Sequence, residues 1–322
     1  MILNKKILLT GGAGFIGSKL CGLLCDNNQI LLYDNLNRNS IKNSNLLNHS
    51  NVTLIQGDIL DYSILKKTIL DFQPHIVIHL AAIAGIDTVI KSPVNTMKVN
   101  MIGTYNLLES LKDNLTNLEK VIDFSTSEVF GSYAYKVNEM NTTNLAPVGE
   151  ARWTYSVSKL AAEHLSHSYY KEYGMPVVTV RPFNIYGPGQ VGEGAIHQFV
   201  VRAIADEQMQ IHGDGDQIRS WCYVEDFIQG IMLCLEKEEA IGQSFNIGNP
   251  RATVTIAMLA ETIKRISNSN SEIKYVSKNY VDVELRIPSI EKAKELLGFS
   301  PKYDLTEGLT KTIDWYRGAN ND

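Results

Sequence analysis

The fold is decided by the stretch Thr10-Gly11-Gly12-Ala13-Gly14-Phe15-Ile16-Gly17, which follows the apolar run Ile7-Leu8-Leu9 and opens a segment of helical character. The pattern predicts a strand, a glycine turn and a helix N-terminus, an arrangement whose backbone N–H groups hold a pyrophosphate. Gly11 permits the tight turn, Gly14 lets the backbone approach the phosphates, and Gly17 lets the helix pack close to the strand. The chain is therefore expected to begin with a dinucleotide-binding unit.

An acidic residue follows the next apolar run. Asp34 comes after Ile30-Leu31-Leu32-Tyr33, at roughly the twenty-residue offset expected of a carboxylate that binds the adenosine ribose. A carboxylate there disfavours the 2′-phosphate of NADP, so we predict NAD, although Arg38 lies nearby. Asp58 follows the β-like run 52–56 and has two interpretations: it accepts a hydrogen bond from the adenine amino group, or it caps a helix that begins near Asp61.

The composition excludes several classes of protein. The 322 residues are 44% hydrophobic and 20% charged, and the net charge of −5 is spread along the chain, which gives no basic surface for nucleic acid. No apolar run reaches transmembrane length and the first strand begins within a few residues, so we expect a cytoplasmic protein without membrane contact. The four cysteines are irregularly spaced, so we expect no metal, with Cys21 and Cys25 as small buried residues.

Strands and helices alternate along the first part of the chain. The apolar run 75–80 predicts a buried parallel strand, and a helix is predicted from about Pro93 to Asp113, with Asn100 as an internal polar position. The strand 121–124 leads into Ser125-Thr126-Ser127-Glu128. This alternation predicts a parallel sheet with right-handed crossovers, and ligands bind at the carboxyl ends of such strands.

A tyrosine and a lysine lie one helical turn apart in the segment that begins at Trp153. Tyr155 and Lys159 share one face of that helix, although a pair at this spacing is common by chance. Their position downstream of a dinucleotide turn and a Ser/Thr-rich strand end predicts a proton-handling site beside a nicotinamide.

In these motifs, and over nearly its whole length, the chain resembles the extended short-chain dehydrogenases/reductases of the NAD-dependent nucleotide-sugar epimerase/dehydratase family. Further matching stretches are 181–188, 213–226 and 246–248. The resemblance implies an α/β fold: a Rossmann-type doubly wound parallel sheet with a smaller C-terminal α/β substrate-binding domain. Residues 1–181 would form the NAD-binding domain, to which some later segments return. Residues 182–322, tail included, would mainly bind the nucleotide sugar, in discontinuous segments.

The resemblance also implies catalytic roles. Tyr155 would be the general base that removes the proton from a sugar hydroxyl, usually at C4, while hydride passes to the nicotinamide. Its pKa would fall from about 10 toward neutrality because Lys159 and NAD⁺ favour the phenolate. Thr126 would hydrogen-bond the same hydroxyl. The cofactor contacts implied are Gly11, Gly14, Phe15, Ile16, Gly17, Asp34, Asn35, Asp58, Ile59, Leu80, Ala81, Ala82, Asn100, Ser125, Tyr155, Lys159 and Pro182.

Substrate contacts are implied in the second half of the chain. Asn184 would bind the sugar or the diphosphate, and Arg219 and Arg286 would bind the diphosphate, because a guanidinium suits bidentate phosphate recognition. A surface ion pair is the alternative for Arg286. Glycines at 187, 189, 192 and 194 predict a flexible loop. Family dimers pair the helices around 95–113 and 153–172 in a four-helix bundle, so we expect a homodimer.

The step after C4 oxidation depends on neighbouring polar residues. Glu128 resembles the carboxylate of dehydratases and uronic acid decarboxylases that works at C5/C6; alternatively, it only hydrogen-bonds a substrate hydroxyl. Ser127 stands where the common 4,6-dehydratases have an Asp, which weakens dehydration. Asp87 is acidic where relatives that act on uronic acids often carry a cation, which argues against a sugar carboxylate on that side, although Arg219 could still face one.

The expected function is oxidation of a nucleotide sugar at C4 and processing of the 4-keto intermediate by a dehydratase-like or decarboxylase-like step that Glu128 assists. Two alternatives are a 4-epimerase and a net C4 dehydrogenase that releases the keto sugar. A non-catalytic NAD-binding sensor is disfavoured because Thr126, Tyr155 and Lys159 are all present.

Overall fold

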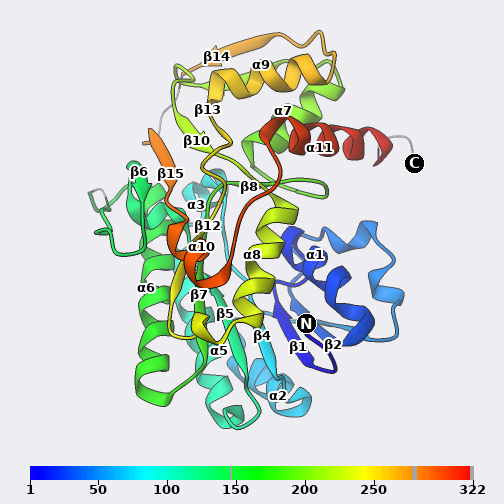
Figure 1. The fold of residues 1–322 in the computed structure, drawn as a ribbon, viewed down its shortest axis with the longest axis vertical. Coiled ribbons are helices and arrows are strands. Elements are labelled where there is room, and N and C mark those ends of the chain that lie inside the picture. Colours follow the sequence, from blue (N-terminus) through cyan, green and yellow to red (C-terminus); the bar gives the residue numbers. More distant parts are fainter. Residues whose placement is uncertain (146, 278–280, 320–322) are drawn as a thin grey trace.

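The larger of the two main sheets has seven strands, all paired in parallel. The structure is a computed structural model that describes residues 1–145, 147–277 and 281–319. The sheet has the strand order β12-β7-β5-β4-β1-β2-β3 (Figure 1). Its strands are β1 (Lys6–Thr10), β2 (Gln29–Asp34), β3 (Val52–Gln56), β4 (Ile76–His79), β5 (Lys120–Phe124), β7 (Val177–Pro182) and β12 (Ser244–Ile247).

Helices cover both faces of this sheet, as predicted from the continuous apolar runs. Ile7 and Leu9 of β1 belong to the core under α1 and α8, whereas Leu8 belongs to the core under α2 and α5. Successive side chains of a strand point to opposite faces, so a strand covered on both sides must be apolar throughout. The predicted Rossmann-type fold is confirmed. These helices are α1 (Phe15–Leu24), α2 (Tyr62–Phe72), α5 (Gly103–Leu111), α6 (Ala151–Tyr173) and α8 (Val224–Glu236).

A second sheet of four strands has the order β13-β10-β15-β6. Its strands are β6 (Tyr133–Val137), β10 (Ile218–Ser220), β13 (Thr253–Thr255) and β15 (Leu285–Pro288). Beside it lie α7 (Ala195–Ile204), α9 (Ile256–Ile266) and α11 (Leu305–Ala319), which pack on one another at the top of Figure 1. The remaining strands are β8 (Ile185–Tyr186), paired with β11 (Cys222–Tyr223), and β9 (Met209–His212), paired with β14 (Ile273–Val276).

The two sheets exchange segments across residue 181. Strand β12 and helix α8 come after this residue and belong to the larger sheet, whereas β6 comes before it and pairs with β15. The tail also divides, because α10 (Glu291–Leu297) packs on β12 while α11 packs on α7 and α9. The expectation that the whole tail belongs to the second domain is therefore wrong for α10. The boundary at 181 remains a prediction.

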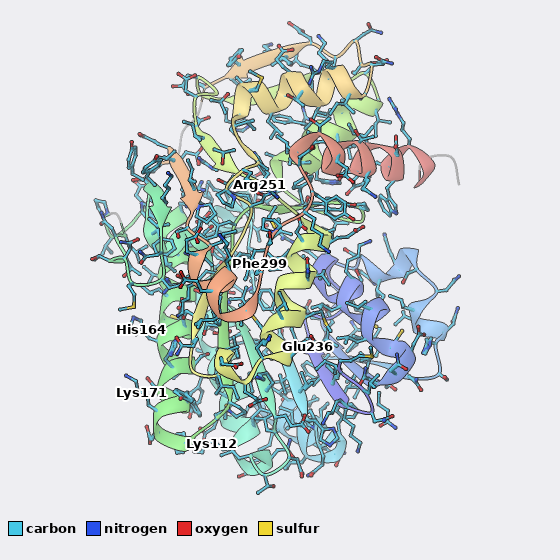
Figure 2. All side chains as sticks on the ribbon, in the orientation of Figure 1. Lys112, His164, Lys171, Glu236, Arg251 and Phe299 are labelled. Carbon is cyan, nitrogen blue, oxygen red and sulfur yellow. The ribbon has the colours of Figure 1, made fainter. Side chains whose placement is uncertain are left out.

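The segment before α11 is fixed to α8. Phe299 is fully buried and lies against Gly230 of that helix (Figure 2). Asp226 of α8 accepts hydrogen bonds from the backbone N–H groups of Lys302, at 2.7 Å, and Tyr303, at 3.1 Å. The helices of the described residues are all too short or too polar to cross a lipid bilayer.

A buried ion pair joins α6 to the end of β7. The Arg181 Nε lies 3.1 Å from both carboxylate oxygens of Glu163, and its Nη2 lies 2.8 Å from one of them. Ser244 of β12 donates a further hydrogen bond, of 2.6 Å, to the same carboxylate. Because both charged side chains are less than a tenth exposed, neither can exchange its partner for water.

We predict that Glu163→Ala lowers the free energy of unfolding by about 3–5 kcal/mol, because it leaves Arg181 charged and buried without its partner. Urea denaturation followed by circular dichroism measures the loss. The double variant Glu163→Leu/Arg181→Met removes both charges and should recover most of it. Equal losses in the single and double variants would contradict the prediction.

Candidate active site

The glycine turn is packed against the chain that follows β4. Gly11 has a φ of +69°, and a Cβ added there would lie 2.6 Å from the backbone nitrogen of Ala81. A Cβ at Gly17 would lie 2.5 Å from the carbonyl oxygen of Gly12. Gly14 is the N-cap residue of α1. Side chains are thus excluded where β1 passes into α1, which leaves a backbone cradle that fits the pyrophosphate of NAD.

Asp34, the last residue of β2, joins this cradle to the next loop. One carboxylate oxygen accepts the N–H of Ala13 at 3.0 Å and the other accepts the N–H of Leu36 at 2.7 Å. Burial raises the pKa of Asp34, and these two hydrogen bonds limit the rise. Each oxygen keeps a lone pair for a ribose hydroxyl, so the residue fits the role predicted for it.

Asp58 does not cap the helix that follows β3. Asp61 caps α2 by accepting the N–H of Ile64 at 3.1 Å, whereas Asp58 accepts the N–H of Leu60 at 2.9 Å. Its side chain is exposed just beyond the sheet edge. The capping interpretation of Asp58 is therefore wrong, and contact with the adenine remains a prediction.

Asn100 lies in a π-helical turn, Lys98–Ile102, between α4 (Pro93–Met97) and α5. Its amide donates to the carbonyl of Ile83 and to the hydroxyl of Ser158, both at 3.0 Å, and accepts the N–H of Ile83 at 2.8 Å. These bonds fix the loop after β4 against α6. The geometry supports a positioning role, and direct contact with the cofactor remains a prediction.

The other residues predicted to contact the cofactor lie at or just after the carboxyl ends of the strands. They are Phe15, Ile16, Asn35, Ile59, Leu80, Ala81, Ala82, Ser125 and Pro182. Beyond them a cavity of about 460 Å³ opens between the two sheets. Pro182 lines this cavity, and so do seven of the eight predicted catalytic and substrate residues. The seven are Thr126, Ser127, Glu128, Tyr155, Asn184, Arg219 and Arg286, and the eighth, Lys159, does not line it.

The chain itself does not lower the pKa of Tyr155. Burial and then the charge of Glu128 raise the pKa to about 12, against the opposing effects of the Thr126 hydrogen bond and of Arg286 and Arg38. Lys159 is not among the causes of this shift, and its predicted help to the phenolate remains a prediction. Bound NAD⁺ would bring a positive charge, which favours the phenolate.

Lys159 is buried behind Tyr155. Burial lowers its pKa, and the nearby carboxylates of Asp123 and Glu163 oppose this. Only 2% of the lysine is exposed, and no hydrogen bond joins its ammonium to a residue in the described part of the chain. An ammonium held there with donors to spare fits the predicted contact with the nicotinamide ribose.

Glu128 is paired with two arginines. One carboxylate oxygen lies 3.1 Å from Nη2 of Arg152 and 3.3 Å from Nη1 of Arg286, and the other accepts the hydroxyl of Ser156 at 3.3 Å. Burial alone would raise the pKa of Glu128, but the arginines outweigh it and hold the pKa below its usual value. Glu128 is thus ionised, and the predicted ion pair of Arg286 is a buried one.

Asp282 extends this network to a third arginine. Its Oδ1 lies 2.9 Å from Nη1 of Arg152 and 3.3 Å from Nη2 of Arg219. Three guanidinium groups and two carboxylates therefore meet at one end of the cavity, with a net charge of +1. The Nε atoms of Arg152 and Arg286 and the indole nitrogen of Trp221 are buried there without a hydrogen-bond partner among the described residues. All three are donors, so this end of the cavity suits an anionic group rich in acceptors.

The sequence analysis missed Arg152, Trp221 and Asp282. Arg152 had a local signal, because it precedes Tyr155 by three residues and so shares its helix face. Asp282 had none, because it reaches the cavity only through the pairing of β15 with β10 and β6.

Asp87 does not face the cavity. Its side chain is exposed, and the cavity is lined by its neighbours Gly85, Ile86 and Val89 instead. The expectation that Asp87 disfavours a sugar carboxylate at the site is therefore wrong.

One group of side chains elsewhere has the spacing of a metal site: Cys25, Asp26 and His49. His49 accepts the N–H of Asn51 on Nδ1 at 3.2 Å and faces Asp26 with Nε2 at 3.3 Å. A metal on Nε2 would require a proton on Nδ1, where the N–H of Asn51 already points, so this geometry opposes a metal. Cys21 and Cys25 are buried, as predicted.

Comparison with known proteins places this site in a family. The family described as GDP-mannose 4,6 dehydratase matches residues 8–312. The chain is 32% identical to the UDP-N-acetyl-alpha-D-glucosaminuronate decarboxylase of Bacillus cytotoxicus, covering 99% of this chain and 100% of the relative. It is 35% identical to UDP-glucuronic acid decarboxylase 5 of Arabidopsis thaliana, covering 95% and 87%. The crystal structure of UDP-glucuronic acid 4-epimerase from Bacillus cereus, in complex with UDP-glucuronic acid and NAD, superposes with a TM-score of 0.87 at 32% identity, covering 98% and 99%.

We predict that Glu128→Gln lowers the pKa of Tyr155 below about 12, because it removes the charge that helps to raise it and frees two arginines. The titration of the Tyr155 signal in NMR spectra of ring-labelled tyrosine measures this, with Tyr155→Phe as the assignment. The phenolate is the basic form, so the limb of the pH–rate profile that reports it moves to lower pH. Glu207→Gln, at an exposed position, is the control; an unchanged or higher pKa in the Glu128 variant contradicts the prediction.

Proposed function

The chain belongs to the GDP-mannose 4,6-dehydratase family of extended short-chain dehydrogenases/reductases, NAD-dependent enzymes that modify nucleotide sugars, and we propose that it decarboxylates a nucleotide-linked hexuronic acid. The observation that carries this proposal is the donor-rich, positively charged end of the cavity beside Tyr155. Every nucleotide sugar carries a diphosphate, but a uronic acid adds the C6 carboxylate, a second anion on the sugar itself, for which the arginines that do not bind the diphosphate are available.

Arg152 is the best-placed partner for that carboxylate. It lies one helical turn before Tyr155, and its Nη2 shares an oxygen of Glu128 with Arg286. Because Arg286 forms an ion pair with Glu128, we assign Arg286 to the sugar rather than to the diphosphate. Arg219 is then the arginine left for the diphosphate. The two carboxylates also keep the site from being so positive that it would retain the C6 carboxylate and oppose its loss as CO₂.

The reaction requires little of the protein once C4 is oxidised. Tyr155 would take the proton of the C4 hydroxyl, and NAD⁺, when bound, would supply the hydride acceptor for C4. The C6 carboxylate would then be β to the resulting ketone. The C5–C6 bond breaks, its electron pair moves into the C4–C5 enolate, and CO₂ leaves. Thr126 and Tyr155 would hold the enolate oxygen, a proton from solvent would be added at C5, and Tyr155 would return its proton to the C4 oxygen when the ketone is reduced again.

The 4-epimerase is the second candidate, because a UDP-glucuronic acid 4-epimerase is structurally similar. Both reactions would use the same carboxylate contacts and the same oxidation at C4. They differ in whether the C5–C6 bond breaks, so the products separate them.

We predict that the purified enzyme with NAD converts a UDP-linked uronic acid into a UDP-pentose and CO₂. The sugar is glucuronic acid or its 2-acetamido counterpart. Mass spectrometry in deuterated water should show loss of the carboxyl carbon and one deuterium at C5, because that carbon is protonated from solvent. A C4-inverted uronic acid that keeps its carboxylate and carries no deuterium would establish the epimerase instead.

Arg152→Gln provides the matched test of the carboxylate assignment. It should weaken the binding of the UDP-uronic acid by about 10–100-fold, as expected for loss of a hydrogen bond to a charged group. Its effect on UDP-glucose binding should be small. The control is Arg265→Gln, on the exposed side of α9. Isothermal titration gives both affinities, and equal weakening for the two ligands would refute the role.

We also infer that the protein is a homodimer through α4, α5 and α6. Ile102, Tyr105 and Val157 are 48%, 47% and 40% exposed, and Ile102 and Tyr105 border a shallow apolar groove formed with Ala161 and Leu165. Such a patch on two neighbouring helices suits a two-fold interface.

We predict that Ile102→Asp/Tyr105→Asp converts the dimer into a monomer, because each copy then places charges in an apolar contact. Sedimentation velocity gives the mass. Leu23→Asp, an equally exposed change on α1 (54%), should leave the mass unchanged. A wild-type protein that sediments as a monomer would refute the inference.

A further inference from the structure

The loop at residues 187–194, here called the lid loop, runs along the cavity from β8 to α7 and contains four glycines. Gly189 and Gly192 have φ values of +83° and +98°, a region that other residues rarely adopt. Gln190, Glu193 and Gly194 contribute to the cavity lining. The lid loop therefore combines backbone freedom with a position directly over the site.

One side chain ties the lid loop to the cofactor-binding half of the molecule. Glu193 accepts the N–H of Asp87 at 2.8 Å, the N–H of Thr88 at 3.2 Å and the Thr88 hydroxyl at 2.5 Å. These donors lie in the first turn of α3 (Ile86–Lys91), which follows β4. Within residues 1–145, 147–277 and 281–319, every hydrogen bond from the lid loop to the larger sheet and its connections ends on Glu193.

Arg38 links the same carboxylate to the loop that follows β2, here called the cofactor loop. It follows Asp34 by four residues, its Nη2 donates to the carbonyl of Ala84 at 2.6 Å, and that nitrogen lies 3.8 Å from Glu193. The close approach needs glycine at 85, because a Cβ there would lie 2.7 Å from the Glu193 carboxylate. The loop that carries the predicted ribose ligand and the lid loop thus meet at one carboxylate.

We propose that Glu193 is a positioning residue that latches the lid loop over the cavity, and that Arg38 joins this latch to the cofactor loop. The lid loop opens only when the bonds to Thr88, Asp87 and Arg38 break together, because all of them end on one side chain. The latch keeps the cofactor and the 4-keto intermediate in the cavity between the two hydride transfers. This inference rests on the NAD dependence of the family and is independent of the decarboxylation.

The test measures how fast reduced cofactor leaves the protein in the absence of any sugar. NADH bound to the enzyme is displaced by excess NAD⁺ in a stopped-flow instrument, and its fluorescence reports release. Glu193→Ala should raise the release rate by about tenfold or more, because several charge-assisted bonds are lost. Glu193→Gln keeps the acceptor oxygen for Thr88 and loses the charge beside Arg38. Its rate of NADH release should therefore lie between those of Glu193→Ala and the wild type.

Two further variants keep the test decisive if Glu193→Ala fails to fold. Thr88→Val removes the shortest bond to the latch and Arg38→Met removes the cation, so each should speed release. Glu207→Ala, an exposed glutamate beyond α7, is the control. In turnover with a UDP-uronic acid, the latch variants should also release 4-keto sugar and leave NADH behind. Release of NADH at the wild-type rate in all folded latch variants would overturn the proposal.

Discussion

The site depends on one ion-pair network, in which Arg152 and Arg286 pair with the partly buried carboxylate of Glu128. A carboxylate withdrawn from water is tolerated only with cationic partners. Here the partners come from different layers: Arg152 from the first turn of α6, beside the larger sheet, and Arg286 from β15 of the second sheet. The ion pair therefore fixes the distance between the two sheets at the cavity and places Tyr155, one turn along α6, at its edge.

The same carboxylate controls the proton chemistry. In the protein alone, burial and the charge of Glu128 raise the pKa of Tyr155 to about 12. Burial also lowers the pKa of Lys159, one helical turn further along α6. A positive charge placed next to such a tyrosine lowers its pKa, and NAD⁺ would be one source of that charge.

Local patterns were sufficient to predict the cofactor half of the fold. The glycine turn, Asp34 and the apolar strands could each be predicted from a few neighbouring residues. Ser125 to Glu128 follow β5, whose end the parallel sheet brings beside β4 and β7. The failures share one physical cause. The position of Asp282, the pairing of β6 with β15 and the pKa of Tyr155 all depend on contacts between distant segments, and so does the hydrogen bond that the backbone N–H of Asp87 donates to Glu193.

Charge is distributed so that each end of the cavity has a different task. Around Glu128 and Asp282, two carboxylates leave three arginines only partly neutralised, and the donors without partners among the described residues suit an anionic ligand. Glu193, elsewhere in the lining, is satisfied by the protein itself through α3 and Arg38. A ligand that binds the arginines therefore does not compete for the bonds that hold the lid loop.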